Sequence, residues 1–222
     1  RIGGITGQGN FDDVYNCYNE GSISAVDAQY VGGICGFGVN NSSVWECYNI
    51  GEVIAEGEST YIGGISGRGA VDTSFNAGNL TGDSYVGGVS GVEGSCCNSY
   101  NIGKIIGNEI VGGVSGNGTV YNSFNSALVN GVVNAGAVSG TGSCYNSYWT
   151  DNCNLSNASN GTISSCKKTS IDNIKTKRWY SDSSNWHKNY PWLFNLYWTF
   201  VDGENDGYPV LKVFYEENYD GE

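Results

Sequence analysis

Side chains able to do acid–base, nucleophilic or metal chemistry are scattered through this sequence and form no catalytic pattern. Its 222 residues include 8 cysteines and a single histidine, His187. One histidine nearly excludes a zinc site or a catalytic triad built on imidazole, and no Cys-x-x-Cys or Cys/His spacing indicates a metal centre. We therefore expect neither a metal nor a cofactor.

Carboxylates are more numerous, with 22 Asp and Glu, and they raise the main alternative, a carbohydrate-active enzyme. A glycosidase needs two carboxylates roughly 5–10 Å apart beside a groove. The acidic residues before residue 149 form no repeating column, and the local clusters, Asp12 with Asp13 and Glu56 with Glu58, are typical of solvated loops. The sequence therefore favours a protein without catalytic activity.

The cations disfavour a lyase that acts on uronic acids. Such an enzyme uses Arg and Lys to stabilise the substrate carboxylate, and residues 1–148 contain only Arg1, Arg68 and Lys104. The formal net charge of −12 also gives the chain no electrostatic attraction to nucleic acid or to an anionic membrane. No apolar run approaches the roughly 20 residues of a membrane helix, so we expect no membrane insertion.

The segment DGENDG at residues 202–207 has the alternating acids of a calcium loop in Asp202, Glu204 and Asp206. In an EF-hand loop the twelfth position would be Val213, which cannot bind calcium, and no helices are expected to flank the segment. We interpret it as a turn before a final strand, with a weak calcium site as the alternative.

The elements that position all these side chains are repeats. An apolar–Gly–Gly motif starts at residues 2, 31, 62, 86 and 111, with a weaker copy at 135, so the intervals are 29, 31, 24, 25 and 24 residues. Each copy is followed by a second motif, such as CYNEGSI at Cys17 or SYNIGKI at Ser99. This order indicates a repeat architecture. Its fixed positions are the glycine pairs and a later asparagine: Gly3, Gly4, Gly32, Gly33, Gly63, Gly64, Gly87, Gly88, Gly112, Gly113, Asn19, Asn49, Asn76, Asn101 and Asn125.

The repeats predict short strands. Each holds runs rich in Val, Ile, Tyr and Phe that are separated by Gly and Asn, which is typical of strands joined by tight turns. A strand of about five residues cannot bury its apolar side alone, but strands of successive repeats can stack in register. The sequence therefore predicts an all-β fold, a right-handed parallel β-helix or solenoid of about six rungs.

Stacking places equivalent residues of successive rungs in columns. A glycine column permits positive φ or a close backbone approach, and an asparagine column can hydrogen-bond along the stack. The Tyr/Phe column before each asparagine is ambiguous. Alternation counted back from Ile23 and Val53 places the rings outside, whereas an aromatic residue at every rung more often belongs to a core. We favour the core, and keep an outer ladder suited to sugars or proteins as the alternative.

The unit YVGGVSG…SYNIGKIIG resembles the GLUG repeat of bacterial cell-surface proteins over residues 1 to about 148, and NSYWTDNC and GENDGYPVL are similar to the ends of such arrays. Members of this family resemble adhesins, and similar repeats occur in non-catalytic parts of secreted immunoglobulin-cleaving metalloproteases. The resemblance implies an extracellular solenoid, displayed on a surface or secreted. It supplies no catalytic residue.

We assign residues 1–149 to the repeats and residues 150–222 to a C-terminal capping region that is rich in tryptophan. A solenoid end exposes an apolar cross-section, so we expect this region to pack on the last rung. A Trp-lined glycan site is the alternative. Cys153 and Cys166 lie outside the repeats and are the disulfide candidates, whereas the repeat cysteines are expected to be small buried residues.

The longest corners fall in the first two rungs, at residues 8–13, 37–43 and 54–61. Extra length confined to corners leaves the rod intact and is where solenoids place binding specificity. We therefore expect a ligand-contacting patch that contains Asn10, Phe11, Asp12, Asp13, Phe37, Asn40, Asn41, Trp45, Glu56 and Glu58.

These inferences indicate a non-catalytic adhesin or structural stalk at a bacterial cell surface, with a host glycan or glycoprotein as its ligand. The chain begins inside the repeated pattern, so we expect a monomeric fragment of a larger surface protein. One alternative is the accessory region of a secreted metalloprotease, which an HExxH stretch in the flanking sequence would indicate. Another is a carbohydrate-active β-helix enzyme, which needs two acids that converge in a cleft.

Overall fold

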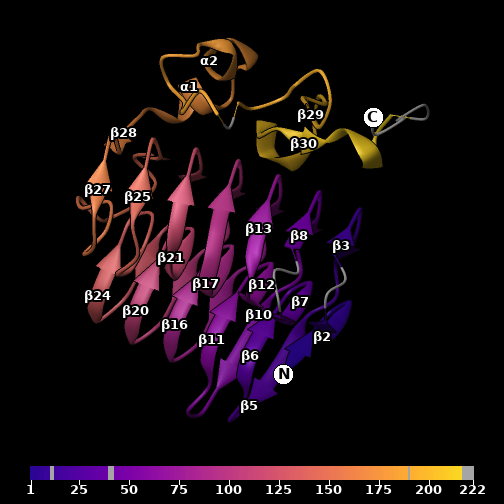
Figure 1. Cartoon of the computed structure of the whole chain (residues 1–222), viewed down its shortest axis with the longest axis vertical. Coiled ribbons are helices and arrows are strands. Elements are labelled where there is room, and N and C mark those ends of the chain that lie inside the picture. The colour runs from indigo at the N-terminus through magenta and orange to yellow at the C-terminus, as the bar shows by residue number, and fades with distance from the viewer. Residues whose placement is uncertain (11–12, 40–42, 190, 217–222) are drawn as a thin grey trace.

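The chain folds into a parallel β-solenoid, which confirms the prediction from the repeats. The computed structural model describes residues 1–10, 13–39, 43–189 and 191–216, apart from the side chains of Asn10 and Val39. Equivalent strands of successive coils pair in parallel, and the coils lie side by side with the C-terminal segment along one flank (Figure 1). Each of the first five coils passes in turn through four sheets, which we call A, B, C and D.

Sheet A contains the first half of each glycine motif. Its parallel register aligns Val31 with Ile62 and Ile62 with Val86, so the apolar residues of neighbouring coils lie side by side. The strands are β1 (Ile2–Gly3), β6 (Gln29–Gly32), β11 (Thr60–Gly63), β16 (Ser84–Gly87), β20 (Glu109–Gly112) and β24 (Val133–Gly136).

Sheet B follows the glycine turn and bends at a corner, so the first coils contribute two strands each and later ones run through the bend. Its strands are β2 (Thr6–Asn10), β3 (Val14–Tyr15), β7 (Cys35–Val39), β8 (Ser43–Trp45), β12 (Ser66–Arg68), β13 (Ala70–Asp72), β17 (Ser90–Cys97), β21 (Ser115–Tyr121), β25 (Cys144–Tyr145) and β27 (Ile163–Ser164).

Sheets C and D complete each coil. Sheet C contains β4 (Tyr18–Asn19), β9 (Tyr48–Asn49), β14 (Phe75–Asn76), β18 (Tyr100–Asn101), β22 (Phe124–Asn125), β26 (Tyr148–Trp149) and β28 (Lys167–Lys168). Sheet D contains β5 (Ile23–Val26), β10 (Val53–Glu56), β15 (Leu80–Thr81), β19 (Ile105–Ile106) and β23 (Val129–Asn130).

The C-terminal segment has little regular structure. It contains the helices α1 (Ile171–Ile174) and α2 (Lys177–Ser181), the antiparallel strands β29 (Trp198–Thr199) and β30 (Val210–Leu211), and 3-10 turns at Asn205–Gly207 and Lys212–Phe214. Among the described residues, no helix has the length and apolar character needed to cross a membrane.

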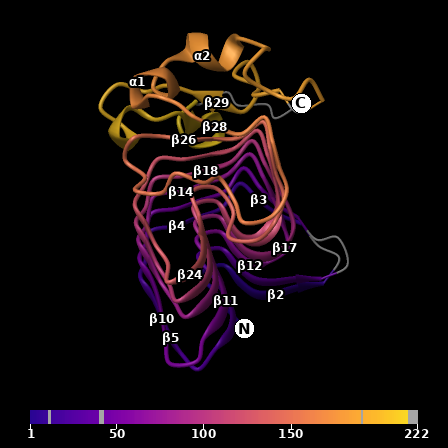
Figure 2. The same cartoon turned by 90° about the vertical axis from the view of Figure 1, so that its left-hand side faces the viewer.

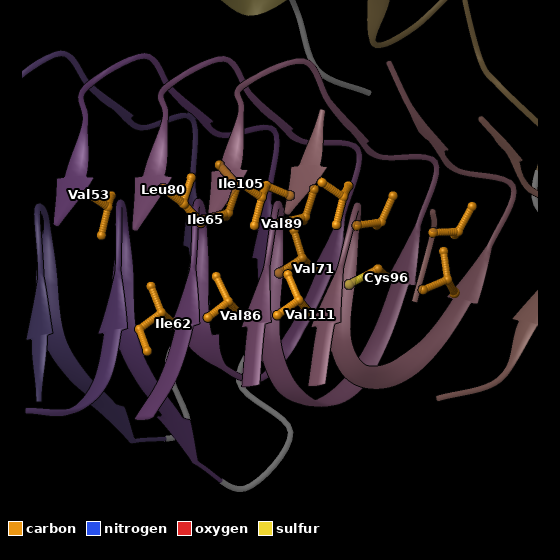
Figure 3. Packing of buried hydrophobic residues seen from close by; sticks show 14 of the residues in the cluster. Val53, Ile62, Ile65, Val71, Leu80, Val86, Val89, Cys96, Ile105 and Val111 are labelled. Atoms are coloured by element: carbon orange, nitrogen blue, oxygen red, sulfur yellow. The ribbon is translucent and has the colours of Figure 1, made fainter. Parts of the chain in front are cut away.

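The interior of the solenoid is a continuous aliphatic core. Side chains from sheets A, B and D point inward and stack coil upon coil, as Figure 3 shows for Ile62, Val71 and Leu80. These three side chains are at most 1% exposed. Burial of each such side chain contributes about 1.5–3 kcal/mol, and the identical coils supply this contribution repeatedly.

The glycine pairs are required because neighbouring backbone segments approach them closely. This was one of the two predicted roles, and the other was a positive φ. Positive φ among the described glycines occurs elsewhere, at residues such as Gly57 and Gly94. A Cβ on Gly32 would lie 2.0 Å from the carbonyl oxygen of Cys35, and one on Gly33 would lie 2.1 Å from that of Gly64. The first glycine therefore permits the tight turn into sheet B, and the second permits neighbouring coils to stack.

The asparagine column forms the predicted hydrogen-bonded ladder. Asn76 Nδ2 donates to Asn101 Oδ1 at 2.8 Å, and Asn101 Nδ2 donates to Asn125 Oδ1 at 2.9 Å. The same Asn101 amide nitrogen also donates to the Gly103 carbonyl oxygen at 2.8 Å. Each of these amides is thereby bonded to its own turn, and Asn76 and Asn101 are also bonded to the next coil. Trp149 occupies the next place in this column, and its buried Nε1–H has no hydrogen-bond partner among the described residues.

The Tyr/Phe column lies outside the aliphatic interior and yet is buried, so neither of the two alternatives holds in full. Its rings stack along the rod with centroids 4.7–5.1 Å apart. Tyr18 in the first coil is 48% exposed, whereas Phe75, Tyr100, Phe124 and Tyr148 are at most 3% exposed. The C-terminal segment covers them.

The C-terminal segment packs along this column, on the flank of the solenoid. We expected it to lie over the end of the last rung, and that expectation is wrong. Its Trp192, Trp198 and Tyr208 pack on the stacked rings, and Phe214 meets Tyr18 and Tyr48 edge-on in the first coils. Figure 2, which looks along the stacked coils, places the segment beside β14, β18 and β26. The outward aromatic column gives the segment a continuous apolar surface to pack against.

The solenoid also continues beyond the boundary that we placed after residue 149. The backbone N–H groups of Val138 and Ser139 donate to the Ala158 carbonyl oxygen, and β27 and β28 extend sheets B and C by one more strand. Residues 153–168 therefore form a partial seventh coil, and the flanking segment begins only with α1.

This seventh coil corrects the predicted disulfide. Cys166 bonds to Cys144 with a Cα–Cα distance of 6.6 Å, whereas Cys153 is a buried free thiol. Tyr148 pairs with Lys167, so Cys166 occupies the same column as Ser147. In this register Cys166 lies beside Cys144 of the preceding coil. The pairing of Cys153 with Cys166 was wrong because it treated residues 150–168 as a loop.

We expect reduction of the Cys144–Cys166 bond to destabilise the protein by about 3 kcal/mol, which is the chain-entropy value for a loop of its 22-residue separation. The free energy of unfolding, from urea titrations with and without reductant, measures the effect. The Cys166→Ser variant should show the lower stability without reductant. A Cys153→Ser control should still respond to reductant, and equal stability of both redox states in wild type would contradict the expectation.

Candidate functional site

The structure separates the predicted corner-loop patch into two corners. The described residues of its first two segments lie at the bend of sheet B: residues 8–10 and 37–39 end β2 and β7, Asp13 precedes β3 and Ser43 begins β8. Glu56 and Glu58 lie at the corner between sheets D and A. Sheet A and the first half of sheet B separate the two corners, so these residues cannot form one contact surface. Phe11, Asp12, Asn40 and Asn41 lie outside the described residues.

The described members of this patch make structural contacts. Asn10 ends β2 and pairs with Val39 in register, while the Asp13 carboxylate accepts a hydrogen bond from the backbone N–H of Ser43 at 2.9 Å. At the other corner, the Glu58 backbone N–H donates to the Asp27 carboxylate at 3.0 Å. These bonds join successive coils.

The two aromatic members of the patch are also held by neighbours. Phe37 is buried, with the guanidinium carbons of Arg1 and Arg68 at 4.3 Å and 4.7 Å from its ring centroid, a cation–π arrangement. Trp45 stacks on Tyr15 on the outer face of sheet B, with centroids 5.1 Å apart. The Tyr15–Trp45 pair offers an aromatic surface in the first coils, and Tyr121 and Tyr145 stack in the same column of later coils, with centroids 5.0 Å apart.

A second aromatic column was not anticipated, and it stands two residues before the glycine pair in three successive coils. Tyr30 and Tyr61 stack on the outer side of sheet A, and the ring of Tyr85 is tilted by 38° to that of Tyr61, with centroids 4.9 Å apart in both pairs. All three residues have positive φ. Burial, with Tyr30 and Tyr85 on either side, raises the pKa of Tyr61. Because the faces of Tyr30 and Tyr61 are turned toward one another along the rod, these rings direct their edges and hydroxyl groups toward the solvent. This column is therefore a poor platform for stacking a sugar ring.

A hollow of the solenoid lies at the bend of sheet B in the later coils, where the corners are short. We call it the corner groove. It has a volume of about 570 Å³ and is polar. Its side chains come from four successive coils: Glu93, Asn117, Thr119, Thr141, Ser143 and Thr162.

A repeated Gly-Ser/Thr step forms the corner groove. Ser95 pairs with Thr119, and the pairing of Val120 with Cys144 and of Cys144 with Ile163 continues this column to Ser143 and Thr162. The preceding glycines have no space for a side chain: a Cβ on Gly142 would lie 2.0 Å from the Gly118 carbonyl oxygen. The coil-to-coil stacking that requires glycine at this bend therefore also leaves the surface hollow.

The electrostatics of the corner groove are close to neutral. Glu93, its one acidic side chain, accepts a hydrogen bond from Arg68 Nε at 2.7 Å, so its charge is compensated. The remaining lining consists of hydroxyl, amide and backbone groups. Such a surface offers donors and acceptors at intervals set by the coil spacing, and it suits an uncharged, hydroxyl-rich ligand better than an ionic one.

The residues considered for calcium do not converge. Asp206 forms an ion pair with Lys175 at 3.3 Å, and Glu204 accepts from the Tyr215 hydroxyl at 3.4 Å. Within the described part of the chain, no group of three or more His, Cys, Asp or Glu side chains is placed to hold a metal ion. The segment is a turn before β30, as the preferred interpretation held.

The buried titratable groups serve the fold. Burial raises the pKa of the Cys47 thiol to about 12, and it also raises the pKa of Asp72, whose carboxylate accepts from the Thr73 hydroxyl at 2.9 Å. A thiol with a raised pKa is a poor nucleophile at neutral pH. Cys35, Cys47, Cys96 and Cys97 are buried, as expected for small residues of the repeats.

Comparison with known proteins identifies no relative: no family model, no curated protein and no solved structure matches this chain. The resemblance to the GLUG repeat therefore stays a prediction from the sequence motifs.

Proposed function

We propose that this chain is a non-catalytic binding module of a bacterial surface or secreted protein, with GLUG-type repeats. In this proposal it contacts a host glycan or glycoprotein along the corner groove. The observation that carries the proposal is the groove itself, with its near-neutral hydroxyl and amide lining presented by four coils of a rigid rod.

The solenoid supplies the geometry that such a function needs. The coils that line the groove are hydrogen-bonded to one another through sheet B, so its polar groups are fixed before a ligand arrives. A pre-organised site loses less conformational entropy on binding than a flexible loop does. The Cys144–Cys166 disulfide is consistent with an extracellular location, because disulfides persist in oxidising compartments.

The experiment is binding of the purified chain to an array of immobilised host glycans and matrix glycoproteins, with a variant that fills the groove. We expect Thr119→Tyr to weaken binding to any retained array member at least about tenfold, which corresponds to 1.4 kcal/mol. Thr119 faces outward from β21 into the groove, so the larger side chain should block it without entering the core.

The matched control is Thr81→Tyr, the same change at an outward position of sheet D, far from the bend of sheet B. It should bind like the wild type. If the folded wild type binds no array member, or if both variants bind equally well, the corner groove is not the binding site and the chain acts as a structural stalk.

A further inference from the structure

A second hollow lies in the C-terminal segment, apart from the corner groove. We call it the Trp179 pocket. It has a volume of about 290 Å³ and forms between the turn that joins α1 to α2 and the residues after α2. Its lining consists of Asn173, Thr176, Arg178, Trp179, Asp182 and Asn185.

The indole of Trp179 is held firmly by other rings. It meets Tyr148, Tyr180 and Trp186 edge-to-face, with centroids 4.9, 5.1 and 4.7 Å away and interplanar angles of 72–79°. Trp179 is half-buried, and among the described residues no ring stacks parallel to it. A flat ligand could supply that parallel contact, with little conformational cost because the side chain is already fixed.

The polar groups around the indole are also held in place while keeping hydrogen-bonding capacity. Asp182 accepts from the backbone N–H and the hydroxyl of Ser184 through one carboxylate oxygen, Oδ1, at 2.9 and 2.7 Å. Asn185 Nδ2 donates to the Trp179 carbonyl oxygen at 2.9 Å, which orients the amide. Asp182 Oδ2 and Asn185 Oδ1 accept no hydrogen bond from another described residue, so both can receive a ligand's hydroxyl.

The charge of the Trp179 pocket selects the ligand class. Arg178 contributes one positive charge and Asp182 one negative charge, so the lining is neutral as a whole. The hydrogen bonds from Ser184, with Arg178 and Lys167 nearby, keep the pKa of the Asp182 carboxyl below its usual value, so it is an acceptor at neutral pH. A neutral ring with one apolar face and a rim of hydroxyl groups matches an indole flanked by planar acceptors and a guanidinium donor.

We propose that the Trp179 pocket binds one sugar unit of a neutral glycan, stacked on Trp179 and hydrogen-bonded through Arg178, Asp182 and Asn185. This inference deepens the proposed glycan-binding function but uses a different surface, because the pocket lies in the C-terminal segment and the groove lies on sheet B. Its small volume fits a single sugar unit, so the affinity should be weak, with a Kd of about 1 mM.

The test is an NMR titration of the whole chain, observing the indole N–H signals, with Trp179→Phe used to assign the Trp179 signal. The probes are maltotriose, lactose and triacetylchitotriose as neutral sugars, with sialyllactose as an anionic one, each up to about 10 mM. We expect at least one neutral probe to shift the Trp179 signal in a saturable manner.

Arg178→Ala is the decisive variant, because Arg178 is exposed on α2 and its removal should leave the fold intact. It should weaken binding of that probe at least about fivefold, whereas the neighbouring exposed Lys177→Ala should not. Thr119→Tyr should leave the Trp179 shift unchanged, which separates this site from the corner groove. The proposal is overturned if no neutral probe shifts the signal, if only sialyllactose does, or if Arg178→Ala binds like wild type.

Discussion

Replacing Gly103 by alanine is expected to destabilise the solenoid by more than about 4 kcal/mol or to prevent folding. The turn between sheets C and D places a Cβ at this position only 1.9 Å from the Gly78 carbonyl oxygen of the preceding coil. The contact is with backbone, so no side-chain rotation can relieve it, and the coils would have to separate. Urea unfolding followed by circular dichroism measures the loss.

Gly21 provides the matched control because it occupies the same column in the first coil. A Cβ on Gly21 meets nothing closer than the Asn19 side-chain oxygen at 3.6 Å, and its φ lies outside the left-handed region. Gly21→Ala should therefore change stability by no more than about 1 kcal/mol in either direction. Equal losses at Gly21 and Gly103 would mean that flexibility of the turn, and not stacking of the coils, explains the glycine column.

Replacing Asn101 by aspartate is expected to cost about 3–5 kcal/mol at neutral pH, although the two side chains have nearly the same shape. Asn101 is fully buried, and its Nδ2 donates to both the Gly103 carbonyl and Asn125 Oδ1. A carboxylate cannot donate, so it would face two acceptors as an uncompensated buried charge. Chemical denaturation at pH 7 is the measurement.

The pH dependence distinguishes this mechanism from a simple packing defect. Burial should raise the folded-state pKa of the new aspartate above its unfolded value of about 3.9. A raised acid pKa means that stability is lost as pH rises through the folded value, so the deficit should shrink in acid. Asn19→Asp, at the half-buried end of the same ladder, should cost about 1 kcal/mol. An equal deficit at every pH would argue against the hydrogen-bond ladder.

Much of the fold follows from the sequence because similar coils require the same residue types at the same positions. The glycine pairs and the asparagine column recur at fixed positions, and only stacked strands satisfy both a close backbone approach and an amide ladder. The aliphatic core follows for the same reason, since residues such as Ile62 and Val86 pair directly in register. Local pattern and tertiary contact agree wherever the contact is between equivalent residues.

The candidate sites were far less predictable from sequence. We predicted a ligand-contacting patch at the long corners of the first coils. The corner groove lies instead at the short corners of later coils, where a glycine such as Gly142 leaves the surface hollow. The repeated steps at Gly118–Thr119 and Gly142–Ser143 were visible, but only the stacked register shows that they adjoin. The Trp179 pocket depends on the path of an irregular segment that has no repeat to fix it.

The sequence alone thus determined the solenoid and its repeating columns. Only the tertiary structure decided where the last 70 or so residues pack, that Cys166 bonds to Cys144, and that the Tyr/Phe column is buried from outside. The physical reason is the range of the contacts. A repeat predicts contacts between equivalent positions one coil apart. Tyr100 contacts Trp198 and Tyr208, which lie about 100 residues later in a segment without repeats, so the periodic pattern cannot predict these contacts.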